Sequence, residues 1–386
     1  MAERYIGLIS GTSMDGIDAA LADFSVHPPR ILAQRTVDFA AKIRAELDAI
    51  RRDPSGFPAR RLAHLDAALG DAFAASAQQI MDQAGVCAAD VCAIGSHGQT
   101  VLHDPDHQPP ATLQIGDPHR IAAQTGVLTV ADFRRADLAA GGQGAPLAPL
   151  LHQALLSRSD ENRAVVNLGG IANITILPAS GGVTGFDTGP ANCLLDLWYR
   201  AHHSDRFDKG GDWAASGRAD SEWLEILLAD QYFARPAPKS TGIEYFSPGW
   251  LGSRLPQWAH DRPADVQATL LELAVQTIAT ALNSLPDDQR PIQVIACGGG
   301  VHNRNLMRRL GESLDPIRFC SSAEHGLDPD LIEALLFAWL ARERVAGRPV
   351  PTGSVTGAQT SVLAGVLFGG HSVTPEPVPT GHGQNR

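Results

Sequence analysis

Residues 5–24 read YIGLISGTSMDGIDAALADF and set the class of fold. Two apolar runs, at 5–10 and 17–24, flank a turn rich in glycine and small polar residues, and a third run follows at 30–39. Apolar runs bounded in this way predict a meander of three strands. A P-loop or a dinucleotide-binding loop would instead lead into a helix, and neither GxxxxGK[ST] nor GxGxxG occurs near this turn.

The same arrangement returns in the second half of the chain. Residues 164–168 (AVVNL) and 171–177 (IANITIL) flank a Gly-Gly turn, and 185–190 (GFDTGP) follows as another polar glycine segment. Two hairpins that open two halves of similar size indicate an α/β protein with a repeat of architecture rather than of sequence. Apolar residues at three- and four-residue steps predict helices at about 60–84, about 266–281 and from 328 to about 344.

Length and composition bound the domain organisation. At roughly 150 residues a domain, 386 residues predict two domains, or three. A stretch rich in Gly and Pro near 132–149 indicates the junction. We expect an N-terminal domain at 1–132, with a segment near 355–370 as a candidate to complete it. A second domain is expected at 133–370, and a loose Pro-rich tail at 371–386.

Charge and cysteine usage exclude several classes of partner. A net charge of −11 lacks the basic footprint of a general nucleic-acid binder. No apolar stretch reaches the about 18 residues of a membrane helix, and the first apolar run is too short for a signal peptide. The five cysteines include no CxxC pair, which favours buried free thiols over disulfides or zinc. We expect a cytoplasmic protein without nucleic-acid or membrane partners.

The turn at 11–18 has the composition of a phosphate-binding loop. Glycine lets the backbone approach a phosphate, and amides and hydroxyls donate to its oxygens. Asp15 and Asp18 are the candidates to hold Mg²⁺, directly or through water. A plain hairpin turn, in which Ser, Thr and Asp bond their own backbone, is an equal alternative.

Two glycine segments of the second half extend the set. Asp187, between an aromatic residue and Thr-Gly-Pro, is expected to project from a tight turn at a strand end, which suits a general base. An Asx turn or a helix cap is the alternative, favoured for an isolated DTGP. The glycines at 298–300 follow a buried strand and would let a flat base or ribose lie against the backbone. A tight strand–helix connection explains them equally.

Three further polar residues are candidates for substrate contacts. His97 lies in SHGQT, expected as a loop at the carboxyl end of a strand, and Arg134 lies at the junction. A bond to a neighbouring backbone group and a surface ion pair are their simpler explanations. Glu333 is the only charge in LIEALLFAWLA, where a carboxylate is costly unless it is paired or bound to a ligand. Exposure at a helix edge is the alternative.

These segments together resemble the anhydro-N-acetylmuramic acid kinase family, of the sugar-kinase/Hsp70/actin superfamily. The resemblance runs in unbroken order from about residue 5 to 365. It is carried by SGTSMDGID, SHGQT, QIGDP, DFR with GGQGAPLAP, NLGGIANI, GFDTGP, DKGG, KSTG and CGGG.

The resemblance implies a fold, a reaction and a site. The fold is α/β, with two related actin-like (ribonuclease H-like) domains and an interdomain cleft. The reaction uses ATP and Mg²⁺ to open the 1,6-anhydro ring with water and to phosphorylate O6, giving N-acetylmuramic acid 6-phosphate in peptidoglycan recycling. The catalytic aspartate corresponds to Asp187, and the sugar contacts to His97, Arg134 and Glu333. The ATP-binding residues correspond to Gly11, Thr12, Ser13, Met14, Asp15, Gly16, Ile17, Asp18, Gly169, Gly298 and Gly299.

Two positions depart from the family pattern. Ala191 stands where glycine is usual, which matters only if the backbone there needs a positive φ. Ile243 stands where the pattern after KSTG has arginine, which removes any arginine contact from this loop.

Two other functions remain open at this point. One is a kinase for a simple hexose or an N-acetylhexosamine, which would phosphorylate an open amino sugar without needing an anhydro ring. The other is a non-enzymatic, nucleotide-gated actin-like binding module, which would hydrolyse ATP without an acceptor and would need a partner surface. The sequence leaves the oligomeric state open, with a homodimer as one option.

Overall fold

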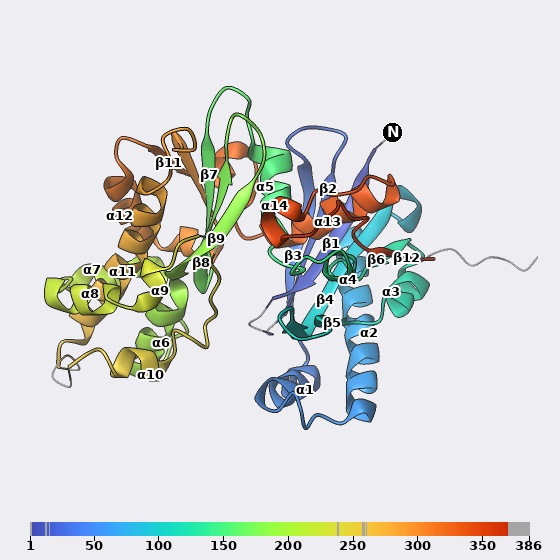
Figure 1. Ribbon diagram of the computed structural model, residues 1–386. Coiled ribbons are helices and arrows are strands. Elements are labelled where there is room, and N and C mark those ends of the chain that lie inside the picture. The colour runs from blue at the N-terminus through green and yellow to red at the C-terminus, as the bar shows by residue number, and fades with distance from the viewer. Residues whose placement is uncertain are drawn as a thin grey trace, which may run out of the picture.

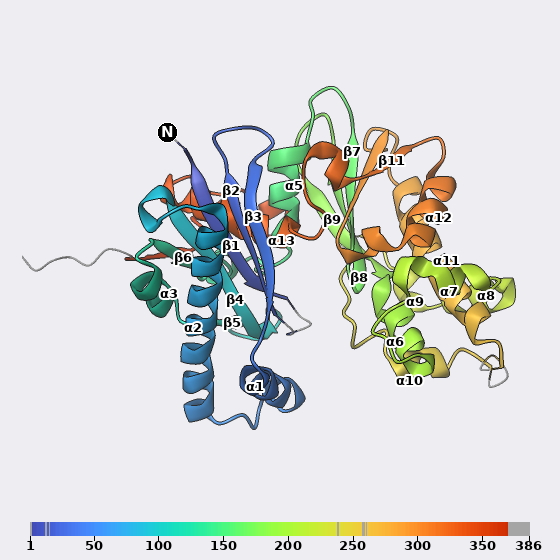
Figure 2. The same ribbon diagram turned by 180° about the vertical axis from the view of Figure 1, so that it is seen from behind.

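The computed structural model describes residues 2–11, 14, 16–237, 239–256, 259 and 261–369. The protein has two lobes side by side, each built on one sheet with helices against it (Figure 1). The view from behind in Figure 2 shows the long helix α2 (Ala59–Ala84) on the outer face of the first sheet.

The first sheet joins a meander to parallel strands. Its strands are β1 (Arg4–Ser10), β2 (Gly16–Asp23), β3 (Arg30–Asp38), β4 (Ala93–Asp104), β5 (Ala111–Ile115), β6 (Thr129–Ala131) and β12 (Val366–Phe368). β1, β2 and β3 pair antiparallel, whereas β4 lies parallel to β1 and β6 parallel to β4. The order is β12-β6-β4-β1-β2-β3, and β5 pairs with β4 outside this path.

The second sheet repeats this plan. Its strands are β7 (Arg163–Leu168), β8 (Ile171–Leu177), β9 (Thr184–Pro190), β10 (Gln293–Cys297) and β11 (Arg318–Ser321). β7, β8 and β9 form the meander, and β10 and β11 continue it in parallel, in the order β11-β10-β7-β8-β9. The five strands β3-β2-β1-β4-β6 and β9-β8-β7-β10-β11 therefore match one for one, and the predicted repeat of architecture is confirmed.

Helices cover both sheets. The first lobe also has α1 (Ala41–Arg52), α3 (Pro118–Thr125) and α4 (Arg135–Ala139), and α5 (Ala148–Leu156) leads into the second lobe. The second lobe has α6 (Asn192–His202), α7 (Asp212–Ser216), α8 (Ser221–Leu228), α9 (Gln231–Ala234), α10 (Pro248–Gly252), α11 (Pro263–Asn283) and α12 (Arg304–Leu314). The chain then returns through α13 (Ile332–Val345) and α14 (Gly353–Thr356). The helices predicted near 60–84 and 266–281 are confirmed as α2 and α11.

Helix α13 belongs spatially to the first sheet, although it lies near the end of the chain. Figure 1 shows it in red against the blue strands, and it contacts β1, β2 and β4. Glycine makes this close packing possible, because a Cβ at Gly7 would collide with the carbonyl of Ala334 and a Cβ at Gly95 with that of Phe337. α5 contacts both α13 and the strand β8, so it joins the first lobe to the second sheet.

The domain boundaries expected at 132 and 370 remain predictions. The contacts add that α13 and β12 lie on the first sheet, where β12 pairs with β6. The tail expected at 371–386 lies outside the described residues.

Three local expectations were wrong. SHGQT was expected in a loop, but it lies inside β4, which continues to Asp104 because β5 pairs with it. GFDTGP was expected in a tight turn, but it lies in β9, paired with β8. The helix expected to start at 328 begins at Ile332. In the part of the chain that is described, no helix is long and apolar enough to cross a membrane.

Candidate active site

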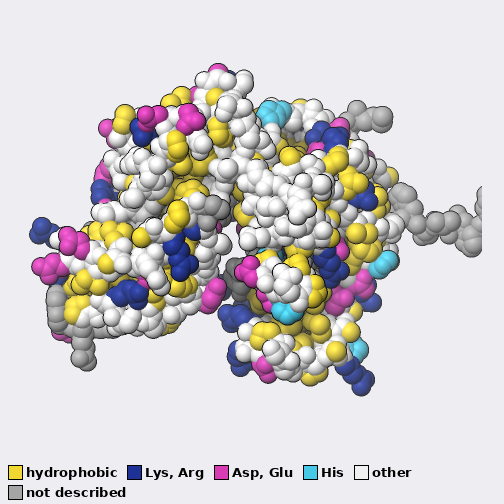
Figure 3. Space-filling model, viewed as in Figure 1, with side chains coloured by type: hydrophobic (Ala, Val, Ile, Leu, Met, Phe, Trp, Pro, Cys, Tyr) yellow, Lys and Arg dark blue, Asp and Glu magenta, His cyan; other side chains and the backbone are white. Residues whose placement is uncertain are grey.

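Two of the cavities between the lobes are lined by residues that the sequence singled out, and the surface is hollowed where the lobes face one another (Figure 3). The larger one, about 490 Å³, takes His103 and Asp106 from the first lobe and Asp187, Lys239 and Ser240 from the second. The smaller one, about 200 Å³, lies between α5, the start of α13 and two glycine turns of the second lobe. Its lining includes His152, Asn167, Gly169, Gly298, Gly299, Asp330 and Glu333.

Asp187 is held firmly in the larger cavity. It pairs with Asn173 across β8 and β9. Its Oδ2 accepts hydrogen bonds from the Ser240 hydroxyl and the Thr241 amide, each at 3.0 Å. Burial raises the pKa of the Asp187 carboxyl, and these two hydrogen bonds oppose the rise. A fixed carboxylate with a raised pKa has the properties of a general base.

His97 and Arg134 form a pair on the first lobe. Arg134 Nε donates to His97 Nε2 at 3.0 Å, and His97 Nδ1 lies 3.1 Å from the carbonyl oxygen of Gly98. Because a guanidinium can only donate, Nε2 accepts and the proton is assigned to Nδ1. Burial and the nearby Arg134 hold the pKa of His97 well below its usual value, so the imidazole is neutral. Phe337 of α13 packs on the ring at 4.5 Å between centroids.

The charges of Arg134 and Glu333 influence one another. Burial lowers the pKa of Arg134 to about 10, against the opposing charges of Glu333 and Asp137, so the guanidinium stays charged near neutral pH. Its Nη1 also donates to the Gly144 carbonyl at 2.8 Å. Glu333, in the first turn of α13, is open to water in the small cavity yet closely surrounded by protein. Desolvation raises its pKa, Arg134 lowers it, and Asp18 raises it further.

The glycine turns meet where the resemblance places a nucleotide. Gly169, Gly298 and Gly299 line the same small cavity as Glu333. Gly298 has φ +81°, and a Cβ there would collide with the Asn167 side chain, so only glycine fits. These four predicted residues are therefore brought together, whereas Asp187 lines the other cavity.

The first hairpin turn is described only in part. Thr12, Ser13 and Asp15 lie outside the described residues. The Met14 amide donates to the Gly11 carbonyl at 3.1 Å, and Ile17 has its side chain in the core. Asp18 accepts a hydrogen bond from the Thr36 hydroxyl at 2.7 Å.

Sequence reasoning did not assign several residues of the site. Ser240 and Thr241 lie in KSTG, a segment noted only as a polar glycine loop, and Tyr232 of α9 donates to the Asp187 carbonyl at 2.8 Å. His152, hidden in the apolar run of α5, has Nδ1 at 2.9 Å from the Thr175 hydroxyl. Its signal was weak, because one histidine on an apolar face more often satisfies a core contact.

The two departures from the family pattern have different consequences. Ala191 has φ −114°, so the added methyl causes no backbone strain. Ile243 is 51% exposed and lies beside the second hairpin turn, where a Cβ on Gly170 would be 3.2 Å from its Cγ2.

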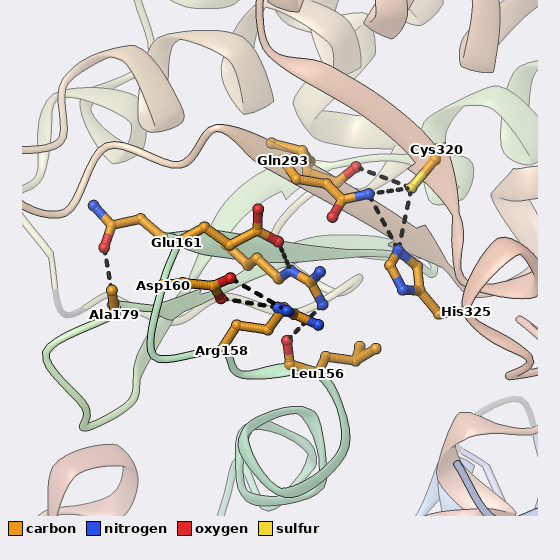
Figure 4. Close-up of polar contacts among 11 residues, drawn as sticks. Leu156, Arg158, Asp160, Glu161, Ala179, Gln293, Cys320 and His325 are labelled. Atoms are coloured by element: carbon orange, nitrogen blue, oxygen red, sulfur yellow. Dashed lines mark hydrogen bonds and ion pairs between the residues drawn. The ribbon is translucent and has the colours of Figure 1, made fainter. Parts of the chain in front are cut away.

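A thiol–imidazole pair elsewhere is not part of this site. Cys320 Sγ lies 3.7 Å from His325 Nε2, and Gln293 Nε2 donates to Cys320 Sγ at 3.3 Å (Figure 4). Burial raises the pKa of the Cys320 thiol, so it is not a thiolate nucleophile. Gln293 begins β10, so the pair lies at the end of the sheet opposite to the glycine turns.

All five cysteines are free, but the expectation that they are buried was wrong for Cys87 and Cys92, which are exposed. Among the described residues, no group of three or more His, Cys, Asp or Glu could hold a metal ion.

Two lobes with matching five-strand orders, and glycine turns facing a cleft between them, define the two-domain class of actin-like ATPases and sugar kinases. The family described as anhydro-N-acetylmuramic acid kinase matches residues 3–370. The anhydro-N-acetylmuramic acid kinase of Xanthomonas campestris pv. campestris (strain 8004) is 51% identical, over 94% of this chain and 97% of that protein. The kinase of the same name from Xylella fastidiosa (strain Temecula1 / ATCC 700964) is 47% identical, over 95% of this chain and 96% of that protein. The chain belongs to the anhydro-N-acetylmuramic acid kinase family.

Solved structures add little to this assignment. The ROK hexokinase from Thermus thermophilus is 17% identical with a TM-score of 0.38, over 88% of this chain and 99% of that one. The activator of the 2-hydroxyisocaproyl-CoA dehydratase from Clostridium difficile, with bound ADPNP, is 12% identical with a TM-score of 0.42. The match covers 90% of this chain and 96% of that one. The fold is defined by the strand order of the two sheets.

Proposed function

We propose that this enzyme opens the 1,6-anhydro ring of anhydro-N-acetylmuramic acid with water and phosphorylates O6 at the expense of ATP. The product is N-acetylmuramic acid 6-phosphate, an intermediate of peptidoglycan recycling. The observation that carries the proposal is Asp187, a fixed carboxylate with a raised pKa in a cavity between the lobes. Membership of the family supplies the substrate.

In this mechanism Asp187 acts as a general base. A water molecule attacks C1, and its proton passes to the Asp187 carboxylate as the C1–O6 bond breaks. The released O6 attacks the γ-phosphorus, the bond to the bridging oxygen breaks, and ADP leaves. Ring opening and phosphoryl transfer are thereby coupled. As in other phosphoryl transfers, catalysis comes mainly from positioning the reacting groups.

The other predicted residues position the two substrates. Neutral His97 holds charged Arg134, whose remaining N–H groups would donate to sugar hydroxyls and the carboxylate, and Glu333 would supply an acceptor. The glycines at 169, 298 and 299 let ATP lie close to the backbone, and the turn at 11–18 receives its phosphates. The lobes must close over both substrates to keep bulk water from the γ-phosphate.

Mg²⁺ would neutralise phosphate charge when bound. The donors fit an ion held mainly by phosphates and water, because such sites need only one or two carboxylates. Asp18 is the described carboxylate of the first hairpin, and its charge raises the pKa of Glu333, which supports a role near the cleft. We further expect the enzyme to work in the cytoplasm, and as a homodimer, which sedimentation of the purified chain will check.

The decisive test is turnover in ¹⁸O-water with ATP, Mg²⁺ and anhydro-N-acetylmuramic acid, analysed by mass spectrometry. We expect a 6-phosphate with one ¹⁸O at the anomeric carbon. Phosphorylation of an ordinary open hexosamine without this label, or ATP hydrolysis that ignores the sugar, would overturn the proposed substrate.

A further inference from the structure

The two oxygens of the Asp187 carboxylate have different surroundings. Oδ2 accepts from the Ser240 hydroxyl and from the Thr241 amide, each at 3.0 Å. In the part of the chain that is described, no hydrogen bond reaches Oδ1. Since Asp187 lines the cavity between the lobes, Oδ1 is the oxygen left for a ligand.

The backbone of Asp187 is held by the same region of the second lobe. The Asp187 amide donates to the Lys239 carbonyl at 3.0 Å, and the Asp187 carbonyl accepts from the Tyr232 hydroxyl at 2.8 Å. Residues 239–241 therefore run beside β9 as an additional partner. Main chain and side chain are fixed together, so the carboxylate has little freedom to exchange its two oxygens.

This segment is itself anchored at both ends. Lys239 Nζ donates to the Phe233 carbonyl at 3.1 Å. On the other side, buried Asp230 accepts from the Tyr245 hydroxyl at 2.9 Å and from the Trp250 indole at 2.8 Å. Asp230 also accepts from the Tyr232 amide at 2.7 Å, so α9 is bonded to the same carboxylate.

We infer that Ser240, together with the Thr241 amide, is a positioning device that makes Oδ1 of Asp187 the oxygen that takes the proton. An oxygen that already accepts two hydrogen bonds is the poorer proton acceptor, so the incoming proton goes to Oδ1. The same two donors stabilise the ionised form, which keeps the buried carboxylate available as a base at neutral pH. This inference rests on the proposed function, because it assigns a role within that reaction.

The test is the pH profile of kcat in Ser240→Ala. Loss of the hydroxyl removes one of the two donors, so kcat should fall about tenfold, with the KM for ATP unchanged. The acidic limb of the profile should move to higher pH, because a donor to the ionised form has been lost. Ser240→Thr keeps a hydroxyl and should restore both values. Ser240 is exposed, so these variants are expected to fold.

The other charged and titratable groups around Asp187 stay in place in both variants. They are Lys239 beside it, Tyr232 from α9, and His103 and Asp106 across the cavity. A movement of the acidic limb in Ser240→Ala is therefore assigned to Asp187. Ser216→Ala is the matched control, because that exposed hydroxyl donates to the Trp213 carbonyl within α7.

Asp187→Asn separates failure of the inference from failure of the proposed function. If Asp187→Asn is inactive while Ser240→Ala keeps the acidic limb of the wild type, the positioning role is wrong and the base stands. If Asp187→Asn turns over normally, the proposed base is wrong. A loss of kcat in Ser240→Ala that Ser240→Thr does not restore would also overturn the positioning role.

Discussion

β3 and β9 occupy the same place in the two sheets, as the outer strand of a meander, yet they carry different chemistry. β9 carries Asp187, whose carboxylate faces a cavity. β3 carries short polar links instead, in which Thr36 donates to Asp18 and Gln34 donates to Asp328. One strand has become a candidate catalytic element, and its counterpart only holds neighbouring segments.

The difference comes from what the chain inserts beside the sheet. Between α6 and α11, the second lobe adds short helices and the segment with Ser240 and Thr241, which bond Asp187. The first lobe has α1 and α2 after β3, and its polar pair consists of His97, within β4, and Arg134, just after β6. The strand order, which is the same in the two sheets, thus determines where each strand lies. The segments inserted beside the sheet determine whether a side chain on that strand is held as a reactive group.

The largest expected effect is at β9. Asp187→Asn should lower kcat by about 10²–10⁴-fold, because the amide cannot accept the proton. ATP binding, measured by calorimetry, should be unchanged. Asp38→Asn, at the end of β3, is the control and should keep full turnover. Substantial residual turnover in Asp187→Asn would remove the functional distinction between the two strands.

The next effect concerns the packing of the first lobe. Gly7→Ala should lower the free energy of unfolding by about 1–3 kcal/mol, because the new methyl collides with the Ala334 carbonyl of α13. Gly252→Ala meets nothing within 4 Å and is the control. Denaturant unfolding measures both. Equal stabilities would mean that α13 is not seated on β1 as described.

A smaller effect is expected at Glu333, in the small cavity that both lobes line. Glu333→Gln removes the charge opposite Arg134, so affinity for the sugar should fall about tenfold. Titration of the sugar at saturating ATP measures this change. If ATP affinity fell instead, Glu333 would belong with the nucleotide that the adjoining glycines receive.

Asp196 of α6 provides a pH test in the second lobe. Burial raises the pKa of this carboxyl from its usual 3.8 to about 6. The folded state therefore holds the proton more tightly, so wild-type stability falls as the pH rises between these values. Asp196→Asn should be more stable than the wild type by about 1 kcal/mol at pH 7, after allowance for water at this half-buried group. The difference should vanish below pH 3.8, and thermal melts across this range will check it.

The smallest expected effect distinguishes the lobes by their thiols. Cys87 and Cys92 of the first lobe are exposed, whereas burial raises the pKa of Cys193 and of Cys297, in the second, to about 12. A thiol reagent at pH 8 should modify the first pair quickly and leave activity intact. Fast modification of a third thiol would show that the second lobe opens.

Local patterns predicted much of this structure. Apolar runs located both meanders, and three- and four-residue spacing located α2 and α11. Glycines beside polar residues indicated the turns that line the small cavity. Each of these features depends on residues that are close together in the sequence, so a sequence pattern can predict it.

Pairing between distant segments was not predictable in the same way. Asp187 was expected in a turn because Gly and Pro flank it, but pairing with β8 makes it part of a strand. Its contact with Ser240 spans 53 residues, and no periodicity indicates such a pair. The position of α13 on the first sheet depends on Gly7 and Gly95, whose role appears only when the helix is in place.

The return of α13 to the first sheet also sets the order in which the protein can be built on the ribosome. Strands β1 and β4 are synthesised early, but the helix that fits against Gly7 and Gly95 is made only after the whole second lobe. Until then, the apolar surface that α13 covers is exposed to water. Synthesis of the second lobe thus delays completion of the first, and a nascent chain stalled before residue 332 would present that surface to chaperones.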